Sequence, residues 1–460
     1  MKTIFLSHRL KWLLVSLIFL STHLFTAYQG YAYLNSGVIG GLHLDASAKD
    51  WAKATIPGDC GIYLRVATNV AEGRGLIDIS GSENAPIYVP FTFWAPGTPW
   101  IFGQYLKLTH STTALSIYIF AMLSQIISGA ILIATLALFT QNLAPLILAS
   151  FFSGWVPPLQ TFIYSAYVSS SEVATMIPQA LFFFFLAKSF IALWSKSIRS
   201  KTVIFYFGIT GLTLGICSII RDSYFQFAEF LAIAIVALVI LRKGRIGISR
   251  ALVASSSLLF CAWIVRVPVL LWNLQREGVK TAYVSGSAGN IWRYGVWEKH
   301  NLVDWQYTSG IGWGDYLSPE TGIKMREAFD RGQLTASLGL KELAKAISRK
   351  PADALLFKVK RWPVLWLGTV EWPHSQMTLV SVYCAAFYFL FLFYLGMCWK
   401  NKTWPLEITY LYALFLFIVS FIIHQEFRYT YPVWATLSIV PSLLILEITK
   451  LWKLREIKNC

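Results

Sequence analysis

Residues 202–220, TVIFYFGITGLTLGICSII, decide the class of fold to which this chain belongs. The run holds no charged side chain, and about 20 apolar residues in a helix are what a hydrocarbon core about 30 Å thick requires. Arg221 and Asp222 follow it directly and separate it from a second apolar run at 223–241. The pattern predicts two consecutive helices that cross a lipid bilayer.

The same pattern recurs through the chain and marks further spans. The predicted spans lie at 12–28, 114–139, 143–165, 172–195, 202–220, 223–241, 251–272, 377–398, 404–424 and 430–451. Of the 460 residues, 56% are hydrophobic and 13% are charged, with a mean hydropathy of +0.55, whereas soluble domains carry about 25% charged residues. We therefore expect an all-α polytopic membrane protein with about 10 to 12 transmembrane helices.

The basic residues between these spans predict the orientation. With the N-terminus in the cytoplasm, five basic clusters lie on the cytoplasmic side, as the positive-inside rule requires. They are Lys2, Arg9 and Lys11; Lys196, Arg199 and Lys201; Arg242, Lys243, Arg245 and Arg250; Lys400 and Lys402; and Lys450, Lys453, Arg455 and Lys458. The net charge of +16 is thus explained by topology and requires no nucleic-acid partner.

Two long stretches interrupt the series of spans and divide the chain. We expect a first transmembrane helix at 1–30, retained rather than cleaved as a signal, an extracytoplasmic segment at 31–112, and a transmembrane bundle at 113–272. A second extracytoplasmic segment at 273–376 and C-terminal transmembrane helices with a cytoplasmic tail at 377–460 follow. Because spans joined by short loops leave little room for chemistry, we expect function in the two extracytoplasmic segments.

Both segments contain patterns of surface helices and of aromatic residues. Residues 63–70 suit a short helix on the membrane surface, and residues 341–361 suit a basic amphipathic helix that either binds the phosphate of an anionic lipid or simply faces solvent. The aromatic residues of the second segment either stack on sugar rings or form an interfacial belt. They are Trp292, Tyr294, Trp297, Trp305, Tyr307, Trp313 and Tyr316.

Four separated motifs resemble those of the polytopic GT-C glycosyltransferases, the superfamily of the protein O-mannosyltransferases and the lipid A aminoarabinose transferase. The first comprises Asp59, Tyr63, Ala67, Asn69, Glu72, Gly73 and Gly75 with Pro90 and the run at 94–99, where Thr98 replaces the usual Tyr. The second comprises Gly211, Leu212, Gly215, Arg221 and Asp222. The third comprises Asn273, Gly278 and 285–290, with Trp272 where an Arg is usual. The fourth comprises His424, Glu426, Arg428, Tyr429 and Pro432.

This resemblance implies an enzyme of a bacterial inner membrane that transfers a sugar from a polyprenyl-phosphate donor to a lipid, glycan or protein acceptor. It implies Asp59 as the general base, although Asp59 also suits a helix N-cap. Glu172 matches a second acidic position of the superfamily, or is a solvated loop charge.

Arg221, Arg428 and His424 then bind the donor phosphate, because guanidinium groups bind phosphate oxygens through parallel hydrogen bonds. The two arginines also suit ion pairs, Arg221 with Asp222 and Arg428 with Glu426 or Glu172. Tyr63, Asp222, Asn273 and Glu426 are the remaining expected substrate-binding residues.

The sequence leaves a second class of protein possible and leaves the need for a cofactor open. A transporter or flippase for a lipid-linked glycan shares the topology, but such proteins usually show related halves, and the sequence has no internal repeat. No His or Cys cluster has metal-ligand spacing, so we expect no cofactor and no metal site, with an auxiliary divalent cation left open.

Overall fold

The chain has a mostly helical fold in a computed structural model. The structure describes residues 8–35, 38–39, 42–43, 59–82, 85–91, 95–111, 114–155, 171–195, 199–243, 247–277, 292, 296–297, 311–331, 336–367, 382, 385–394, 396–397 and 440–459. Within these ranges, six helices are long and apolar enough to cross a membrane. The chain is an integral membrane protein.

The six long helices coincide with six of the predicted spans. They are α1 (His8–Asn35), α4 (Ala114–Ala137), α7 (Ser171–Trp194), α8 (Ser200–Ile220), α9 (Ser223–Lys243) and α10 (Ile248–Glu277). Large apolar side chains on their outer faces remain exposed, for example Ile233 and Phe260, as expected where lipid is the solvent. The apolar runs at 202–220 and 223–241 therefore form consecutive spans, as predicted.

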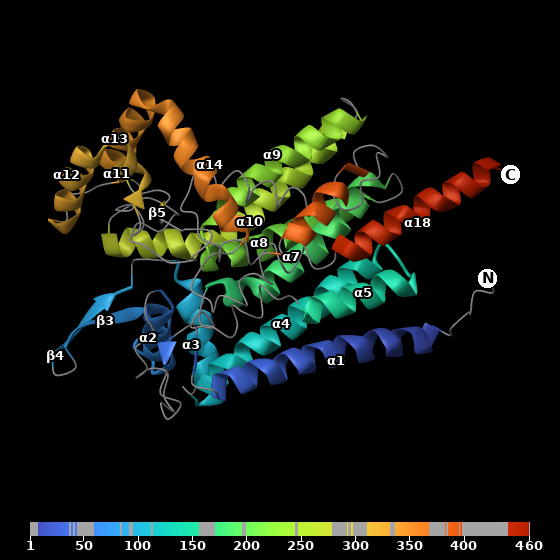
Figure 1. The fold of residues 1–460 in the computed structure, drawn as a ribbon, viewed down its shortest axis with the longest axis horizontal. Coiled ribbons are helices and arrows are strands. Elements are labelled where there is room, and N and C mark those ends of the chain that lie inside the picture. Colours follow the sequence, from blue (N-terminus) through green and yellow to red (C-terminus); the bar gives the residue numbers. More distant parts are fainter. Residues whose placement is uncertain are drawn as a thin grey trace.

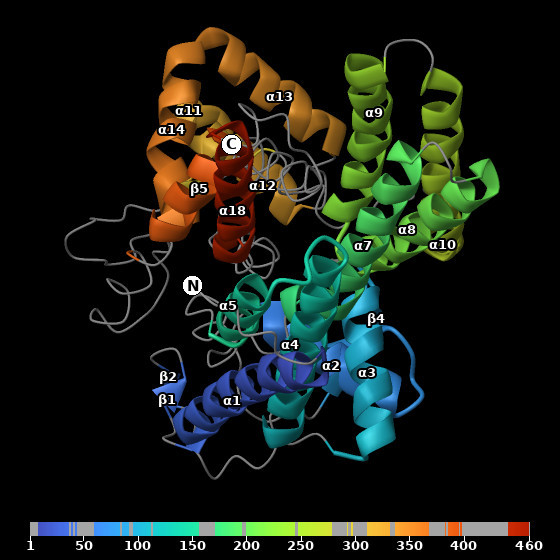
Figure 2. The same cartoon turned by 90° about the vertical axis from the view of Figure 1, so that its right-hand side faces the viewer.

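Helix α8 lies at the centre of a four-helix group. It packs against α7 on one side and α10 on the other, and α9 packs against both α8 and α10 (Figure 2). Gly211 permits the close approach of α8 to α10, because a Cβ at this position would overlap the carbonyl oxygen of Leu258. Helix α4 joins this group to α5 (Leu143–Gly154), which in turn packs against α1.

Four predicted spans differ from the structure or lie partly outside it. In the span expected at 143–165, α5 ends at Gly154, shortly before Pro157 and Pro158, which disfavour a continuing helix, and residues 156–165 lie outside the described residues. The expected span at 377–398 contains a short apolar helix at Ala385–Tyr394. The span at 404–424 lies outside the described residues, and the span at 430–451 is described only from Val440, where α18 (Val440–Asn459) begins.

The fold is mostly helical, and the described segments between the spans also contain short strands. Three antiparallel two-stranded sheets form, from β1 (Val38–Ile39) with β2 (Leu42–His43), β3 (Ile77–Ser82) with β4 (Ala85–Pro90), and β5 (Val296–Trp297) with β6 (Ile311–Gly312). In β3, Ile77 and Ile79 alternate with polar residues, which is the strand pattern. Ile77 pairs with Pro90, and Ser82 pairs with Ala85.

Six further helices lie in the part of these segments that the structure describes. They are α2 (Asp59–Ala71), α3 (Gly97–Thr109), α11 (Trp313–Leu317), α12 (Pro319–Asp330), α13 (Ala336–Arg349) and α14 (Pro351–Leu367). The predicted helix around 63–70 is confirmed as α2. The single basic helix expected at 341–361 is wrong, because α13 ends at Arg349 and Pro351 begins α14. Proline lacks the N–H that a continuing helix needs, but it suits the first turn of a new one.

Different parts of the chain lie at the two ends of the helix bundle. The start of α1 and the end of α18 lie at one end, and α2, α3, the β3–β4 hairpin and α11–α13 lie at the other (Figure 1). We call this second end the segment end. It gathers the parts of the chain that the sequence predicted to hold the functional site.

Candidate functional site

An ion pair joins the start of α7 to the end of α8 at the segment end. Arg221 is the C-terminal cap of α8, where the backbone becomes extended, and its Nη1 lies 2.5 Å from Oε1 of Glu172 in the first turn of α7. The Ser171 hydroxyl donates to the other carboxylate oxygen of Glu172, at 3.2 Å. The side chain of Glu172 is 3% exposed, so the ion pair with Arg221 compensates a carboxylate that water barely reaches.

A second ion pair lies beside the first, between the α8–α9 turn and α10. Arg266 of α10 is fully buried and forms an ion pair with Asp222 through Nη2. Its Nη1 donates to the carbonyl oxygen of Ser218, and its guanidinium lies 5.5 Å from the centre of the Phe225 ring. Arg221 therefore pairs with Glu172 rather than with Asp222, and the expected pairing of these two neighbours is wrong.

Arg266 is a residue of the site that the sequence reasoning missed. A signal was present, because Arg266 is the one charged side chain between 251 and 272, and a charge within a span is costly unless it is paired or functional. Its partner Asp222 is 44 positions away, which hydropathy does not reveal. The two ion pairs tie together the segment ends of α7, α8, α9 and α10.

Helix α3 docks onto the end of α8 next to these ion pairs. The Thr98 hydroxyl donates to the carbonyl oxygen of Ile220 at 3.5 Å, and a Cβ at Gly97 would lie 2.5 Å from the carbonyl oxygen of Ile219. Gly103, two turns along α3, gives equally close contact to α2, because a Cβ there would lie 2.6 Å from Cβ of Val70. Helix α3 therefore holds α2 at the segment end.

The motif residues after α2 form the turn that leads into β3. Gly73 and Gly75 have φ angles of 83° and 84°, a region that favours glycine. The Asn69 side chain donates to the carbonyl oxygen of Ile77 at 2.7 Å and accepts from Arg74 at 2.9 Å. These three motif residues thus have a structural role in shaping the first segment.

Tyr63 and Asn273 lie where the first segment meets α10. Tyr63 is 6% exposed, and its ring meets that of Phe91 edge-on at 6.2 Å. Trp272 of α10 packs against the same small core, and its neighbour Asn273 is 1% exposed. Arg266 and Asn273 are seven residues apart and so share one face of α10. Tyr63 has the environment of a packing residue in this structure.

Asp59 is the first residue of α2, one turn before Tyr63. Its side chain lies outside the described residues, so its role as base or cap stays a prediction. His424, Glu426 and Arg428 also lie outside them. In the described part of the chain, no three His, Cys, Asp or Glu side chains gather as metal ligands.

The fold is similar to that of solved oligosaccharyltransferase structures from Archaeoglobus fulgidus. The structure with a tethered acceptor peptide containing the NVT sequon matches with a TM-score of 0.50 and 11% identity, over 92% of this chain and 49% of that chain. The structure of AglB with an inhibitory peptide and a dolichol-phosphate gives a TM-score of 0.49 and 12% identity, over 95% and 51%. The apo form gives 0.48 and 14%, over 96% and 52%.

The first of these matches shows a shared fold. The chain spans about half the length of the archaeal protein, 49% of it in the first match. No protein-family model and no curated protein matches the sequence. The chain therefore has a membrane fold like that of the archaeal oligosaccharyltransferase, and its relation to the GT-C glycosyltransferases, the protein O-mannosyltransferases and the aminoarabinose transferase among them, stays a prediction.

Proposed function

We propose that this chain is a membrane glycosyltransferase that moves a sugar from a polyprenyl-phosphate donor to an acceptor at the extracytoplasmic face of a bacterial inner membrane. The segment end of the bundle is that face, and the chain termini are cytoplasmic. The acceptor is a lipid, a glycan or a protein. The archaeal oligosaccharyltransferase that shares the fold was solved with an acceptor peptide, which supports glycosyl transfer as the reaction class.

The observation that carries this proposal is the meeting of α2 and the two ion pairs at the segment end. Helix α3 contacts both α2 and the end of α8, so Asp59 at the start of α2 belongs to the same end of the bundle as Arg221. A base for the acceptor and a cation for the leaving phosphate are the two groups that this reaction needs most.

In the proposed reaction, Asp59 takes the proton of an acceptor hydroxyl while that oxygen forms a bond to the anomeric carbon of the donor sugar. The bond between the anomeric carbon and the phosphate oxygen breaks, and its electron pair leaves with the polyprenyl phosphate. Arg221 stabilises the charge that develops on this phosphate. Arg428 and His424 are proposed to share that task.

Glu172 acquires a more specific role than that of a second catalytic acid. Its carboxylate holds Nη1 of Arg221 at 2.5 Å and so fixes the direction in which the guanidinium points. A guanidinium has five N–H donors, so one such group can bind a carboxylate and a phosphate at the same time. Glu172 is then a positioning residue. Arg266 likewise fixes the direction of the Asp222 carboxylate. Asp222 is proposed to contact substrate, together with Asn273 and Glu426.

The experiment is a donor-turnover assay on the purified chain in lipid nanodiscs, comparing Arg221→Ala with Arg326→Ala. Arg326 is an exposed arginine of α12, so its variant controls for the lost charge. The expected result is a loss of about 10²- to 10³-fold in kcat/KM for Arg221→Ala, with Arg326→Ala unchanged. Equal activity of both variants would remove Arg221 from the mechanism.

A second arm separates the enzyme from the transporter. Vesicles that contain the chain are loaded with a fluorescent lipid-linked glycan, and its movement between leaflets is followed together with release of polyprenyl phosphate. The proposal requires release of polyprenyl phosphate. Movement of intact donor without any release would replace the proposal by a flippase.

A further inference from the structure

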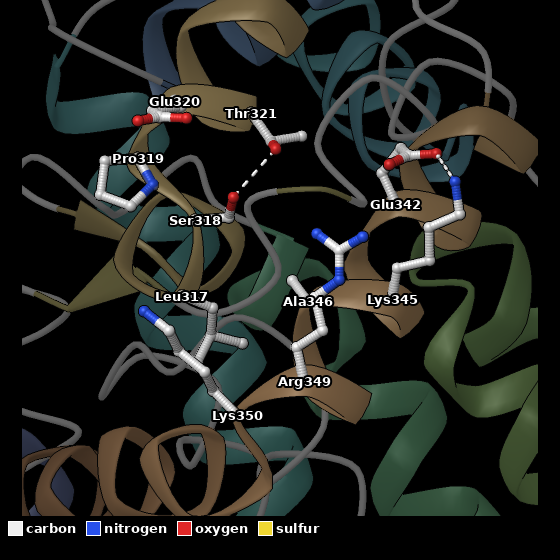
Figure 3. A pocket seen from close by; sticks show the side chains of 10 residues that line it. All are labelled: Leu317, Ser318, Pro319, Glu320, Thr321, Glu342, Lys345, Ala346, Arg349 and Lys350. Atoms are coloured by element: carbon white, nitrogen blue, oxygen red, sulfur yellow. Dashed lines mark hydrogen bonds and ion pairs between the residues drawn. The ribbon is translucent and has the colours of Figure 1, made fainter.

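A polar cavity lies in the segment 311–350. It has a volume of about 400 Å³ and opens between the start of α12 and the last turns of α13. Leu317 and Ala346 form its apolar floor, and polar side chains form its walls (Figure 3). Cavities of roughly 300–1,000 Å³ are the usual size for small-molecule sites.

The walls carry more positive than negative charge. Lys345, Arg349 and Lys350 line the cavity together with Glu320 and Glu342. The charge of Glu342 is compensated, because Lys345 Nζ lies 2.6 Å from its Oε1. Arg349 and Lys350 form no ion pair or side-chain hydrogen bond within the described residues. Arg349 and Lys350 then stand against Glu320 alone, so the cavity carries one excess positive charge.

The direction of Arg349 argues against a purely local role at the end of its own helix. Basic residues in a last turn often complement the helix dipole, and Arg349 is the last residue of α13. Its guanidinium, however, lies at the cavity, between the Ser318–Thr321 pair and Glu342 (Figure 3). Glu320 lies at the far edge of the cavity in the same view.

Opposite Arg349, the cavity is lined by hydroxyl groups at the start of a helix. The Ser318 hydroxyl donates to that of Thr321 at 2.9 Å, and α12 begins at Pro319. The first backbone N–H groups of a helix have no partner within it and favour anions. An anion held between Arg349 and this helix start would meet donors from both walls.

We propose that this cavity binds a sugar-sized ligand that carries a phosphate or carboxylate group, with the anion held by Arg349 and Lys350. The cavity volume sets the size of the ligand and the unmatched guanidinium sets its charge, since Arg binds planar or tetrahedral oxyanions through two parallel hydrogen bonds. The ligand is either a soluble sugar phosphate or the headgroup of an anionic lipid. The inference does not depend on glycosyl transfer.

The test measures binding of glucose 6-phosphate and of glucose to the full chain in phosphatidylcholine nanodiscs, by isothermal titration calorimetry. Arg349→Gln and Lys350→Gln remove the proposed contacts. Lys341→Gln is the matched control, because Lys341 is an exposed cation of α13 that does not line the cavity. All three changes are at exposed positions, so folding is expected to be preserved, and thermal unfolding of each variant verifies this.

The expected result is binding of glucose 6-phosphate but not of glucose, weakened about 10- to 100-fold by Arg349→Gln and by less than about twofold by Lys341→Gln. If glucose 6-phosphate fails to bind, nanodiscs doped with phosphatidylglycerol decide whether a lipid headgroup is the ligand. An Arg349-dependent rise in Tm in those nanodiscs supports the proposal in its lipid form. Binding of neither probe, or equal weakening by Lys341→Gln and Arg349→Gln, overturns it.

Discussion

The buried pair between Asp222 and Arg266 predicts an unequal response to removal of its two partners. In Asp222→Ala, the guanidinium of Arg266 stays behind with 0% of its side chain exposed. In Arg266→Met, the carboxylate that stays behind is on a side chain with 26% exposure, so water reaches it in part. The first variant is expected to cost more, because water cannot reach the guanidinium charge that it leaves behind.

The magnitudes follow from this difference in exposure. Leaving a buried charge unpaired costs about 3–5 kcal/mol, and we expect Asp222→Ala to lie in that range, reduced somewhat by the Ser218 carbonyl and the Phe225 ring that still contact Arg266. Arg266→Met is expected to cost about 1–3 kcal/mol, as for a partly solvated group that loses its partner. The double variant is expected to be more stable than Asp222→Ala alone, because it leaves neither charge.

The assay is unfolding of the purified chain in mixed micelles titrated with sodium dodecyl sulfate, followed by circular dichroism. The four proteins of the cycle give a coupling free energy for the pair. Two results would refute the reasoning. One is a cost for Arg266→Met that equals or exceeds the cost for Asp222→Ala, and the other is additivity of the two changes to within about 0.5 kcal/mol.

Two further predictions concern helix packing and metal dependence. Gly211→Ala is expected to destabilise the chain by about 3 kcal/mol, because the added Cβ would overlap the backbone oxygen of Leu258, whereas Gly208→Ala meets only side-chain atoms at 3.3 Å or more and should cost far less; equal thermal stability of the two variants would contradict the described contact of α8 with α10. Removal of divalent cations with EDTA is expected to leave donor turnover unchanged, because the carboxylates of Glu172 and Asp222 are each paired with an arginine. Activity that is lost with EDTA and restored by one added divalent cation would show a metal requirement.

The transmembrane helices could be predicted from the sequence because their signal is local. The run at 202–220 needs only its own side chains to be identified as a span, and α8 matches it closely. The sequence also held signals for the end of α5 and for the break between α13 and α14, namely the prolines at 157 and 351. A hydropathy average over many residues does not detect single prolines. The β3–β4 hairpin shows period-two alternation over too few residues to stand out beside the helical pattern.

The sequence pointed to both residues of the first ion pair but not to their pairing. The resemblance indicated Glu172 and Arg221 separately, yet their contact joins residues 49 positions apart and depends on how α7 and α8 pack. Their roles in a site stay predictions. Arg266 was missed because it lies in an apolar run outside every motif, and only the position of Asp222 in three dimensions gives it a partner. Tyr63 matched a motif position and is buried against Phe91, and its contact with substrate stays a prediction.

The most direct test of the central claim measures sugar transfer by the purified full-length chain in nanodiscs, with Asp59→Asn beside it. The donor is a polyprenyl-phosphate sugar radiolabelled in the sugar, and envelope extract supplies acceptors. The account predicts label in an acceptor and release of polyprenyl phosphate by the parent chain, with a loss of at least about 10²-fold in Asp59→Asn at unchanged helical content. Full transfer activity in Asp59→Asn would contradict the assigned base, and absence of any donor turnover by the parent chain would contradict the transferase itself.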